Sequence, residues 1–95
     1  MKNLKPSTQY KKDLKRLRNN PKKVAELLKV LHILEHELEI PEEYKPHILT
    51  GDYNGCMECH IQGDFLLIWI DQDSDEIYLV RLGSHSELFG KGIKR

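Results

Sequence analysis

The chain has 95 residues, a length at which a single domain with a small hydrophobic core is expected. Hydrophobic residues make up 39% of the sequence and charged residues 32%, which is typical of a soluble globular protein and excludes a disordered or membrane chain. No apolar run approaches the roughly 20 residues of a membrane-spanning helix, and residues 1–6 lack the apolar stretch of a signal peptide. We therefore expect one cytoplasmic domain that covers residues 1–95.

The charge of the chain is divided unequally, although 15 basic and 15 acidic side chains cancel overall. Residues 1–30 contain 10 Lys or Arg side chains and 2 acidic ones, whereas residues 31–95 contain 5 basic and 13 acidic ones. A basic half of this density suits a polyanion such as RNA, or an acidic protein partner. The alternative is that the lysines only keep a helix surface solvated, and charge alone does not decide between the two.

Two helices are predicted in the N-terminal half. The first begins after the cap residue Ser7 and carries an apolar stripe at i, i+4 and i+7. Asn20 and Pro21 favour the start of a second helix, because Asn is a good cap and Pro suits the first helical position. This second helix is predicted to continue to Pro41. The stripe residues are Tyr10, Leu14 and Leu17 in the first helix, and Val24, Leu27, Leu28, Leu31, Leu34 and Leu38 in the second.

From Gly55 onward the hydrophobic pattern has the period of a strand. Residues 57–61 alternate between apolar and polar side chains, which predicts a strand with one exposed face. Residues 65–70 are apolar at nearly every position, as expected of a central strand covered on both faces. Residues 77–83 supply the last strand. Its side chains that we expect to face the helices are those of Tyr78, Val80 and Leu82.

The expected fold is therefore α+β. The two helices form a hairpin that packs on one face of a small antiparallel sheet, and residues 2–5 are a candidate edge strand. Polar turns at residues 62–64 and 71–75 connect the strands.

Two cysteines and a histidine match a known motif. Cys56, Cys59 and His60 fit the C-x-x-C-H pattern of covalent haem attachment, and the cysteines alone fit the C-x-x-C pattern of redox and zinc sites. In a strand, however, residues three apart point to opposite faces, so the two sulfurs cannot readily share a metal or form a disulfide. We therefore expect no metal and no cofactor, with Cys59 in the core and Cys56 as a partly exposed thiol.

The same alternation places four polar side chains on the sheet face away from the helices, namely those of Glu58, His60, Arg81 and His85. Together they could provide the base, the acid and the charge stabiliser that RNA cleavage without a metal needs. The base takes the proton of the ribose 2′-hydroxyl, that oxygen attacks the adjacent phosphorus, and the acid protonates the departing 5′-oxygen. Histidine suits both roles because it titrates near neutral pH. Surface histidines without a function would show the same spacing.

The remaining histidines have simpler interpretations. His32 and His36 lie beside the apolar stripe of the second helix and are interpreted as surface residues rather than metal ligands. His47 follows Pro46 in the segment between helix and sheet, where functional loops are common. The alternative for His47 is a turn residue with a local hydrogen bond.

Several segments together resemble the YafQ-type toxins of the RelE/ParE superfamily, from one end of the chain to the other. The resemblance implies a RelE-like fold, cleavage of messenger RNA in the ribosomal decoding site, and a co-expressed antitoxin. The most specific part of the resemblance is the last matching segment, residues 81–89. The segments are Gln9–Asp13, Pro41–Tyr44, His47–Gly51, Glu58–Ile61 with Asp64, and Arg81–Phe89.

The resemblance also implies roles for individual residues. The ending H-x-x-L-F supplies a catalytic histidine, here His85, and a phenylalanine that packs at the site, here Phe89. We expect His85 to be the acid and His60 the base, with Arg81 stabilising the phosphate charge. The catalytic candidates are His47, Glu58, His60, Asp64 and His85. The expected RNA contacts are Lys11, Lys12, Phe65, Arg81 and Phe89.

Two positions depart from the family pattern. Met57 stands where a relative has an arginine, and Phe65 replaces the tryptophan that follows the family aspartate. A phosphate contact and a stacking surface are therefore expected to be weaker or moved. Activity is expected to differ in rate or in sequence preference.

Two other functions fit part of the sequence. A ParE-type toxin uses a similar fold to poison DNA gyrase and needs no group of histidines, so His60, Asp64 and His85 argue against it. A nucleic-acid-binding module without activity would need only the basic helices, and a fold by itself does not exclude it.

Overall fold

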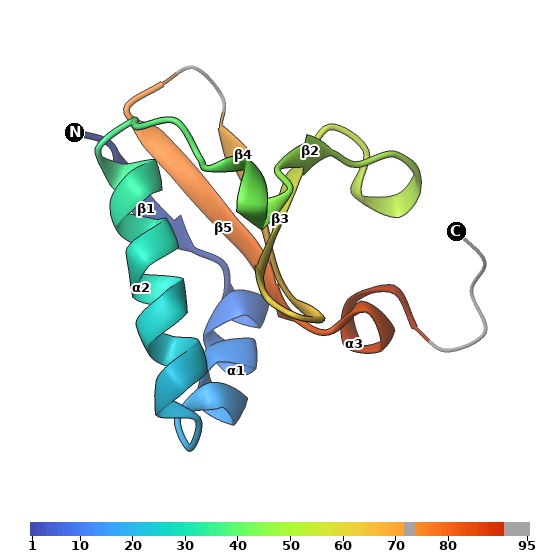
Figure 1. Ribbon diagram of the computed structural model, residues 1–95. Helices are drawn as coiled ribbons and strands as arrows, with labels where there is room; N and C mark the ends of the chain where they lie inside the picture. The colour runs from blue at the N-terminus through green and yellow to red at the C-terminus, as the bar shows by residue number, and fades with distance from the viewer. Residues whose placement is uncertain (72–73, 91–95) are drawn as a thin grey trace.

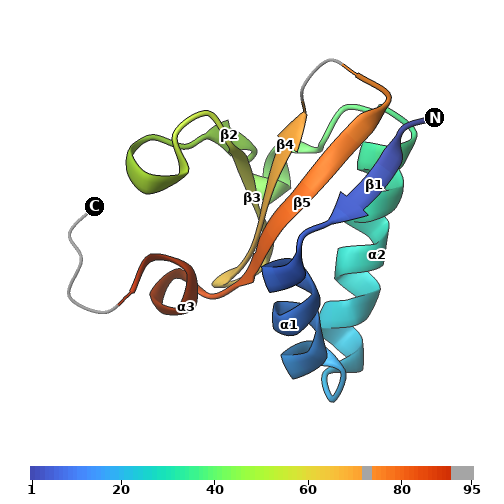
Figure 2. The same ribbon diagram turned by 180° about the vertical axis from the view of Figure 1, so that it is seen from behind.

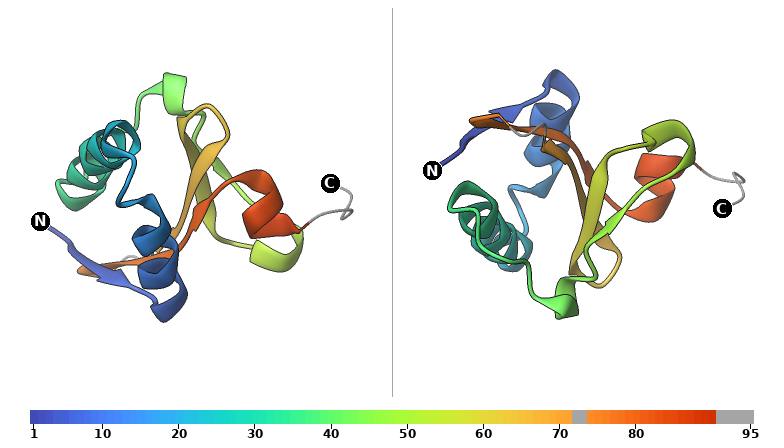
Figure 3. Two further views of the ribbon diagram at one scale, coloured as in Figure 1. Left: turned by 90° about the horizontal axis from the view of Figure 1, so that it is seen from below. Right: turned by 90° about the horizontal axis from the view of Figure 1, so that it is seen from above.

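The computed structural model describes residues 1–71 and 74–90. In it, helices α1 (Thr8–Leu17) and α2 (Pro21–Glu35) cover one face of a five-stranded sheet (Figure 1). The short helix α3 (His85–Phe89) follows the last strand and lies on the opposite side of the sheet (Figure 2 and Figure 3). The strands lie in the order β1 (Asn3–Pro6), β5 (Glu76–Gly83), β4 (Phe65–Asp71), β3 (Met57–Gln62) and β2 (His47–Ile48).

The expected α+β class is confirmed, and so is the edge strand at the N-terminus. That strand, β1, runs parallel to β5, so the sheet is mixed rather than purely antiparallel. Strand β2, at the other edge, was not predicted because two residues are too few to carry a hydrophobic pattern. The 3₁₀ helices η1 (Glu42–Tyr44) and η2 (Gly51–Tyr53) flank β2 in the connection from α2 to β3. Part of the turn expected at residues 71–75 lies outside the described residues.

No helix within residues 1–71 and 74–90 is both long enough and apolar enough to cross a membrane.

Helix α2 is shorter than its apolar stripe predicts. The helix ends at Glu35, and the prediction that it continues to Pro41 is wrong. Glu37 adopts a left-handed backbone with φ of 58°, a conformation that ends helices. The carbonyl of Glu35 accepts a hydrogen bond of 2.8 Å from the backbone N–H of Lys2, and Leu38 is 55% exposed. Contact with the N-terminal segment therefore accompanies the end of the helix.

Both faces of the sheet are covered, and strand β4 contributes to two hydrophobic clusters. Phe65, Leu67 and Trp69 belong to the larger cluster under α1 and α2, whereas Leu66 and Ile68 belong to a smaller cluster on the side of α3. This confirms the prediction of a central strand that is buried on both faces. The larger cluster also contains Tyr10, Leu27, Val30, Leu34, Cys59, Ile61, Ile77, Leu79 and Leu82.

The two cysteines lie in different clusters, as the strand pattern predicted. Cys59 is in the larger cluster and Cys56 in the smaller one, and both thiols are free. Burial, together with the neighbouring charge of Glu58, raises the pKa of Cys59 to about 12, which makes this thiol inert. The prediction that Cys56 is partly exposed is wrong, because the smaller cluster buries it.

A bulge interrupts the alternation of β5. Trp69 pairs with Leu79 and Ile68 with Arg81, so Val80 is left out of the pairing between β4 and β5. Leu79 and Leu82 therefore both face the helices, although they are three residues apart. Of the three residues that we expected to face the helices, only Leu82 does so. Tyr78 is exposed and Val80 packs in the smaller cluster, because an extra residue in one strand reverses the parity.

A buried carboxylate on α1 ties this helix to β5. Asp13 is 4% exposed, and it accepts hydrogen bonds from Nε and Nη2 of Arg81 at 2.8 and 3.2 Å and from the backbone N–H of Leu82 at 3.0 Å. Burial alone would raise the pKa of Asp13, but these hydrogen bonds and the charge of Arg81 lower it below its usual value. Asp13 is therefore ionised in the folded protein.

Replacing Asp13→Asn should lower the free energy of unfolding by about 3 kcal/mol at pH 7, because Arg81 would lose its buried counter-ion. The lowered pKa means that the carboxylate stabilises the fold fully above about pH 4 and progressively less as the pH falls through the folded-state pKa. The difference between variant and parent should therefore shrink in acid. Urea unfolding followed by circular dichroism measures it.

The exposed Asp52 provides the control, since Asp52→Asn removes a carboxylate of the same kind from the surface. Equal stabilities of the parent and the Asp13→Asn protein at pH 7 would contradict the role given to the buried pair.

Candidate active site

Three histidines surround a buried carboxylate on the side of the sheet opposite α1 and α2. Glu58, on β3, is 2% exposed, and its Oε1 lies 3.0 Å from Nε2 of His47 and 3.9 Å from Nε2 of His60. Its Oε2 is buried without a hydrogen-bond partner among the described residues. Because buried polar atoms are nearly always paired, this oxygen is a candidate to bind a ligand.

The hydrogen bonds of His47 indicate which of its ring nitrogens carry a proton. Its Nδ1 lies 2.8 Å from the carbonyl oxygen of Lys45, and a carbonyl can only accept, so Nδ1 carries a proton. The contact of 3.0 Å between Nε2 and Glu58 then requires a second proton between the two groups. His47 and Glu58 therefore form a pair that shares a proton, next to His60.

His85 is held by the turn between β3 and β4. It is the first residue of α3, and both its Nδ1 and its backbone N–H contact Oδ1 of Asp64. The hydrogen bond from His85 lowers the pKa of Asp64, so this exposed carboxylate is an ionised acceptor. Nδ1 of His85 is thereby fixed as a donor, which leaves Nε2 to face other groups.

These residues converge. The ring centroids of His60 and His85 are 5.7 Å apart, and those of His47 and His60 are 6.2 Å apart. This confirms that His60 and His85 share one face of the sheet. A cavity of about 460 Å³ opens beside them, bounded by η2 and α3. Its lining residues are His47, Ile48, Leu49, Thr50, Gly51, Glu58, His85 and Phe89. The five residues named as catalytic candidates thus form one cluster.

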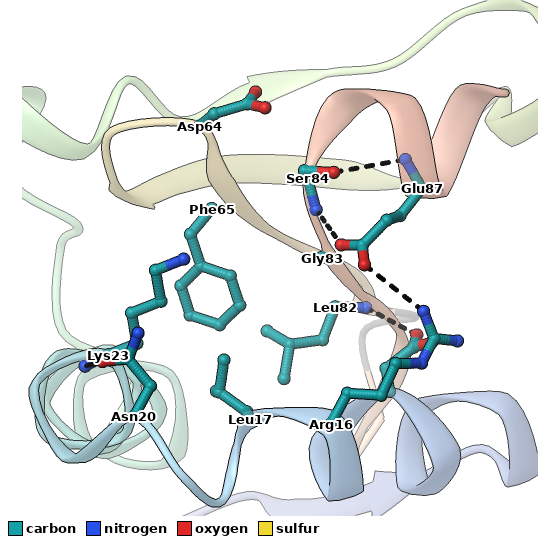
Figure 4. Close-up of a pocket in the computed structure, with 11 residues that line it drawn as sticks. Arg16, Leu17, Asn20, Lys23, Asp64, Phe65, Leu82, Gly83, Ser84 and Glu87 are labelled. Carbon is teal, nitrogen blue, oxygen red and sulfur yellow. Dashed lines mark hydrogen bonds and ion pairs between the residues drawn. The ribbon is translucent and has the colours of Figure 1, made fainter. Parts of the chain in front are cut away.

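Helix α3, which presents His85, is fixed by a capping box. Oγ of Ser84 accepts a hydrogen bond from the backbone N–H of Glu87, whose Oε1 accepts one of 2.8 Å from the N–H of Ser84 (Figure 4). A side chain at Gly83 would approach Oε1 of Glu87 to 2.8 Å, so glycine leaves room for this carboxylate. The sequence interpretation missed this helix, although the S-x-x-E pattern of residues 84–87 would have predicted it.

The Asp13–Arg81 pair also reaches α3. Nη1 of Arg81 donates to the hydroxyl of Tyr53 at 3.3 Å, and that hydroxyl donates to the carbonyl of Leu88 at 3.0 Å. The ring of Tyr53 lies edge-on to that of Phe89, at 5.4 Å between centroids. Tyr53 was not foreseen, because a single tyrosine in a loop carries no pattern. Arg81 was expected on the open face, but its donors bind Asp13 and Tyr53, and it is not among the residues that line the cavity.

Not every expected RNA contact lies near the histidines. Phe65 is 4% exposed and packs in the larger cluster, with the ammonium of Lys23 at 5.4 Å from its ring centroid (Figure 4). It lies on the helix side of β4, so the expectation that it stacks on RNA is wrong. Phe89 does border the cavity, with its ring centroid 6.0 Å from that of His85. Lys11 and Lys12 are exposed on α1.

The sequence as a whole matches one family of known proteins. A profile described as "Bacterial toxin of type II toxin-antitoxin system, YafQ" matches residues 2–90. The chain belongs to this family. It is 33% identical over 85 residues to the mRNA interferase toxin YafQ of Escherichia coli K12, which covers 88% of this chain and 91% of that protein. The resemblance found in the sequence is therefore confirmed.

Solved structures of two bacterial toxins share the fold. A metal-bound toxin from Helicobacter pylori has a TM-score of 0.83 and 39% sequence identity, covering 94% of this chain and 100% of that one. The toxin chain of the E. coli DinJ-YafQ complex also has a TM-score of 0.83, at 28% identity, covering 95% and 100%. The expected RelE-like toxin architecture is confirmed by these matches.

Replacing Ser84→Ala should loosen α3 without unfolding the domain. Loss of an N-cap costs about 1 kcal/mol, which corresponds to a roughly fivefold change in an equilibrium constant. The backbone N–H of Leu88, which donates to the carbonyl of Ser84, should therefore exchange with deuterium about five times faster. Ser74→Ala makes the same change at an exposed residue outside α3 and should leave this rate nearly unchanged. Equal exchange rates in the two variants would argue against the capping box.

Proposed function

We propose that this chain is an endoribonuclease toxin that cleaves messenger RNA without a metal cofactor. The observation that carries the proposal is the cluster of Glu58, His60 and His85 beside an open cavity, with Asp64 orienting one imidazole. Histidines and carboxylates so arranged provide proton donors and acceptors for attack by a ribose 2′-hydroxyl. The proposal agrees with the name of the E. coli relative, an mRNA interferase toxin.

In the proposed reaction His60 is the base and His85 the acid. His60 removes the proton of the 2′-hydroxyl, whose oxygen attacks the adjacent phosphorus. The bond between phosphorus and the 5′-oxygen breaks, and His85 donates a proton to that oxygen from Nε2, since its Nδ1 is bound to Asp64. The products are a 2′,3′-cyclic phosphate and a 5′-hydroxyl. Phe89 packs against the acid and limits its rotation.

The pair of His47 and Glu58 supports the base. Because the two groups share a proton at 3.0 Å, they can accept or return one without large movement. Oε2 of Glu58 has no hydrogen-bond partner among the described residues, but it is buried, so a substrate hydroxyl would reach it only after neighbouring side chains move. His47 is therefore the alternative base, and the two assignments differ in which histidine matters more when it is replaced.

The side chain of Arg81 has few hydrogen-bond donors left for a phosphate. Nε and Nη2 of its side chain donate to Asp13 and Nη1 donates to Tyr53, so the N–H groups left for a phosphate are the second ones of Nη1 and Nη2. We assign Arg81 mainly to positioning Tyr53 and α3. Direct stabilisation of the phosphate, as the sequence suggested, would use these two remaining N–H groups.

Replacing His85→Ala or His60→Ala should each slow cleavage by about 100-fold to 10,000-fold, the usual effect of losing a positioned acid or base. Phe89→Ala should act more weakly, because it changes only the geometry. Single-turnover cleavage of messenger RNA, with and without ribosomes, measures these rates and also tests whether cleavage occurs on the ribosome. If the His47→Ala protein cleaves RNA more slowly than the His60→Ala protein, His47 is the base.

Asn54→Ala, a change of an exposed loop residue, is the control and should cleave at the parental rate. A folded His85→Ala protein that cleaves nearly as fast as the parent would remove His85 from the mechanism. Inhibition of DNA gyrase without RNA cleavage would favour the ParE-type alternative, and RNA binding without cleavage would favour a binding module.

A second candidate property is metal binding at the same residues. Ligand atoms of Glu58, His60 and His85 all lie within 4.8 Å of one another, and the H. pylori relative is described as metal-bound. The donor set fits a borderline divalent ion such as Zn²⁺. When bound, such an ion supplies Lewis acidity. It would also occupy the imidazole nitrogens that transfer protons, so we propose that it inhibits the toxin.

Added Zn²⁺ should therefore slow RNA cleavage, because it competes with proton transfer at His60 and His85. A chelator selective for transition metals, which leaves Mg²⁺ on the ribosome, should restore the rate and should not slow the metal-free protein. Activity that disappears with this chelator and returns with Zn²⁺ would contradict both the inhibition and the metal-independent mechanism.

We further propose that an antitoxin silences the chain in the cell. The E. coli relative has been solved in a complex with DinJ, and toxins of this family belong to toxin-antitoxin systems. The basic surface of α1 and α2 and the open cavity are the two regions that an acidic or helical segment of such a partner would cover. Covering the cavity would exclude RNA directly.

A further inference from the structure

A second group of metal-binding side chains lies outside the proposed active site. His32 and His36 are one helical turn apart at the end of α2, with ring centroids separated by 4.2 Å. Nε2 of His36 lies 3.9 Å from Oε1 of Glu35. Ligand atoms of all three residues lie within 4.8 Å of one another. The three side chains therefore converge on one point of the surface.

The chemistry and spacing suit a transition metal. Zn²⁺ binds imidazole nitrogen at about 2.0–2.1 Å and carboxylate oxygen at about 2.0–2.2 Å, so its ligand atoms can be at most about 4 Å apart. The required contraction is less than about 1 Å, and His32 and His36 are exposed and can rotate to make it. Two histidines at i and i+4 of a helix are a known metal-binding arrangement.

The local field also favours a cation. The group lies at the C-terminal end of a 15-residue helix, where the helix dipole is negative. Glu37 and Glu39 follow, both exposed; the N-terminal ammonium lies 4.0 Å from Glu37, so Glu39 is the one that adds to the negative field. The backbone of this turn is held in place, because the carbonyl of Glu35 accepts a hydrogen bond from Lys2 of the N-terminal segment. A metal would therefore bind to a turn that is already ordered.

We propose that His32, Glu35 and His36 bind one divalent transition-metal ion, such as Zn²⁺, Ni²⁺ or Cu²⁺, with water completing its coordination. This site is separate from Glu58, His60 and His85. The end of α2 lies beside the N-terminus of the chain, whereas α3 lies at the other end of the molecule (Figure 1). Binding would join two successive turns of α2 and would stabilise the folded protein, since the unfolded chain lacks the arrangement.

The test is a Zn²⁺ titration by calorimetry of the full chain carrying His60→Gln and His85→Gln, which disable the other group of ligands. One equivalent should bind. Adding His32→Gln or His36→Gln should weaken binding by more than about tenfold, since even an outer-shell partner of a metal ligand is worth that much. Glu35→Gln should weaken binding more than Glu39→Gln, which removes the same charge nearby from a residue that is not a ligand.

The outcome that would overturn the site is Zn²⁺ binding that is absent from the starting protein or unaffected by His32→Gln and His36→Gln. Equal effects of Glu35→Gln and Glu39→Gln would reduce Glu35 from a ligand to part of a general negative field and would overturn the three-ligand site. If the chain with His60→Gln and His85→Gln does not fold, NMR of the parent chain provides a second test. Substoichiometric Cu²⁺ should broaden the NMR signals of residues 32–36, and unbroadened signals there would also refute the proposal.

Discussion

The ion pair between Asp13 and Arg81 determines where both α1 and α3 lie. Helix α1 has only ten residues, and of these only Tyr10 and Asp13 are buried, so apolar contacts alone hold it weakly. A buried carboxylate is costly unless donors surround it, and β5 supplies them through Arg81 and the N–H of Leu82. Since Arg81 also binds Tyr53, and Tyr53 binds the carbonyl of Leu88, the same pair orients the helix that presents His85. Core stability and site geometry are thereby coupled.

The side chains of strand β3 belong alternately to the hydrophobic core and to the candidate site. Cys59 and Ile61 are fixed in the cluster beneath the helices, while Glu58 and His60, which alternate with them, point to the other side. A rigid strand whose alternate side chains are locked in a core holds its remaining side chains more accurately than a loop does. His47 and His85 come from less regular segments, and each is anchored by its own hydrogen bond, to Lys45 and to Asp64. The cluster is ordered before any substrate binds.

Periodicity predicted the helices, the central strand and the shared face of His60 and His85, because each depends on the pattern of a continuous element. It failed where a contact from elsewhere changes the element. Val80 reverses the parity of β5 through a bulge, and α2 ends at Glu35 beside Lys2. Asp13 and Tyr53 could not be foreseen for the same reason: their partner, Arg81, is 68 and 28 residues away in sequence. Asp64 was found only through the family resemblance, which also gave His47, until then a loop residue with two possible interpretations, its place in the site.

Glu58 is the residue that stability alone explains least. Burying a carboxylate with one oxygen unpaired costs about 1–3 kcal/mol or more, and an apolar side chain at this position would avoid that cost. Strain of this kind is common at functional sites, where the missing partner is supplied by a ligand. A ribose hydroxyl that donates to Oε2 would satisfy the oxygen while Oε1 stays bound to His47. Glu58 is also one of the three residues whose ligand atoms could hold a metal ion, so the proposed metal affinity comes from the same side chains as the proposed RNA cleavage.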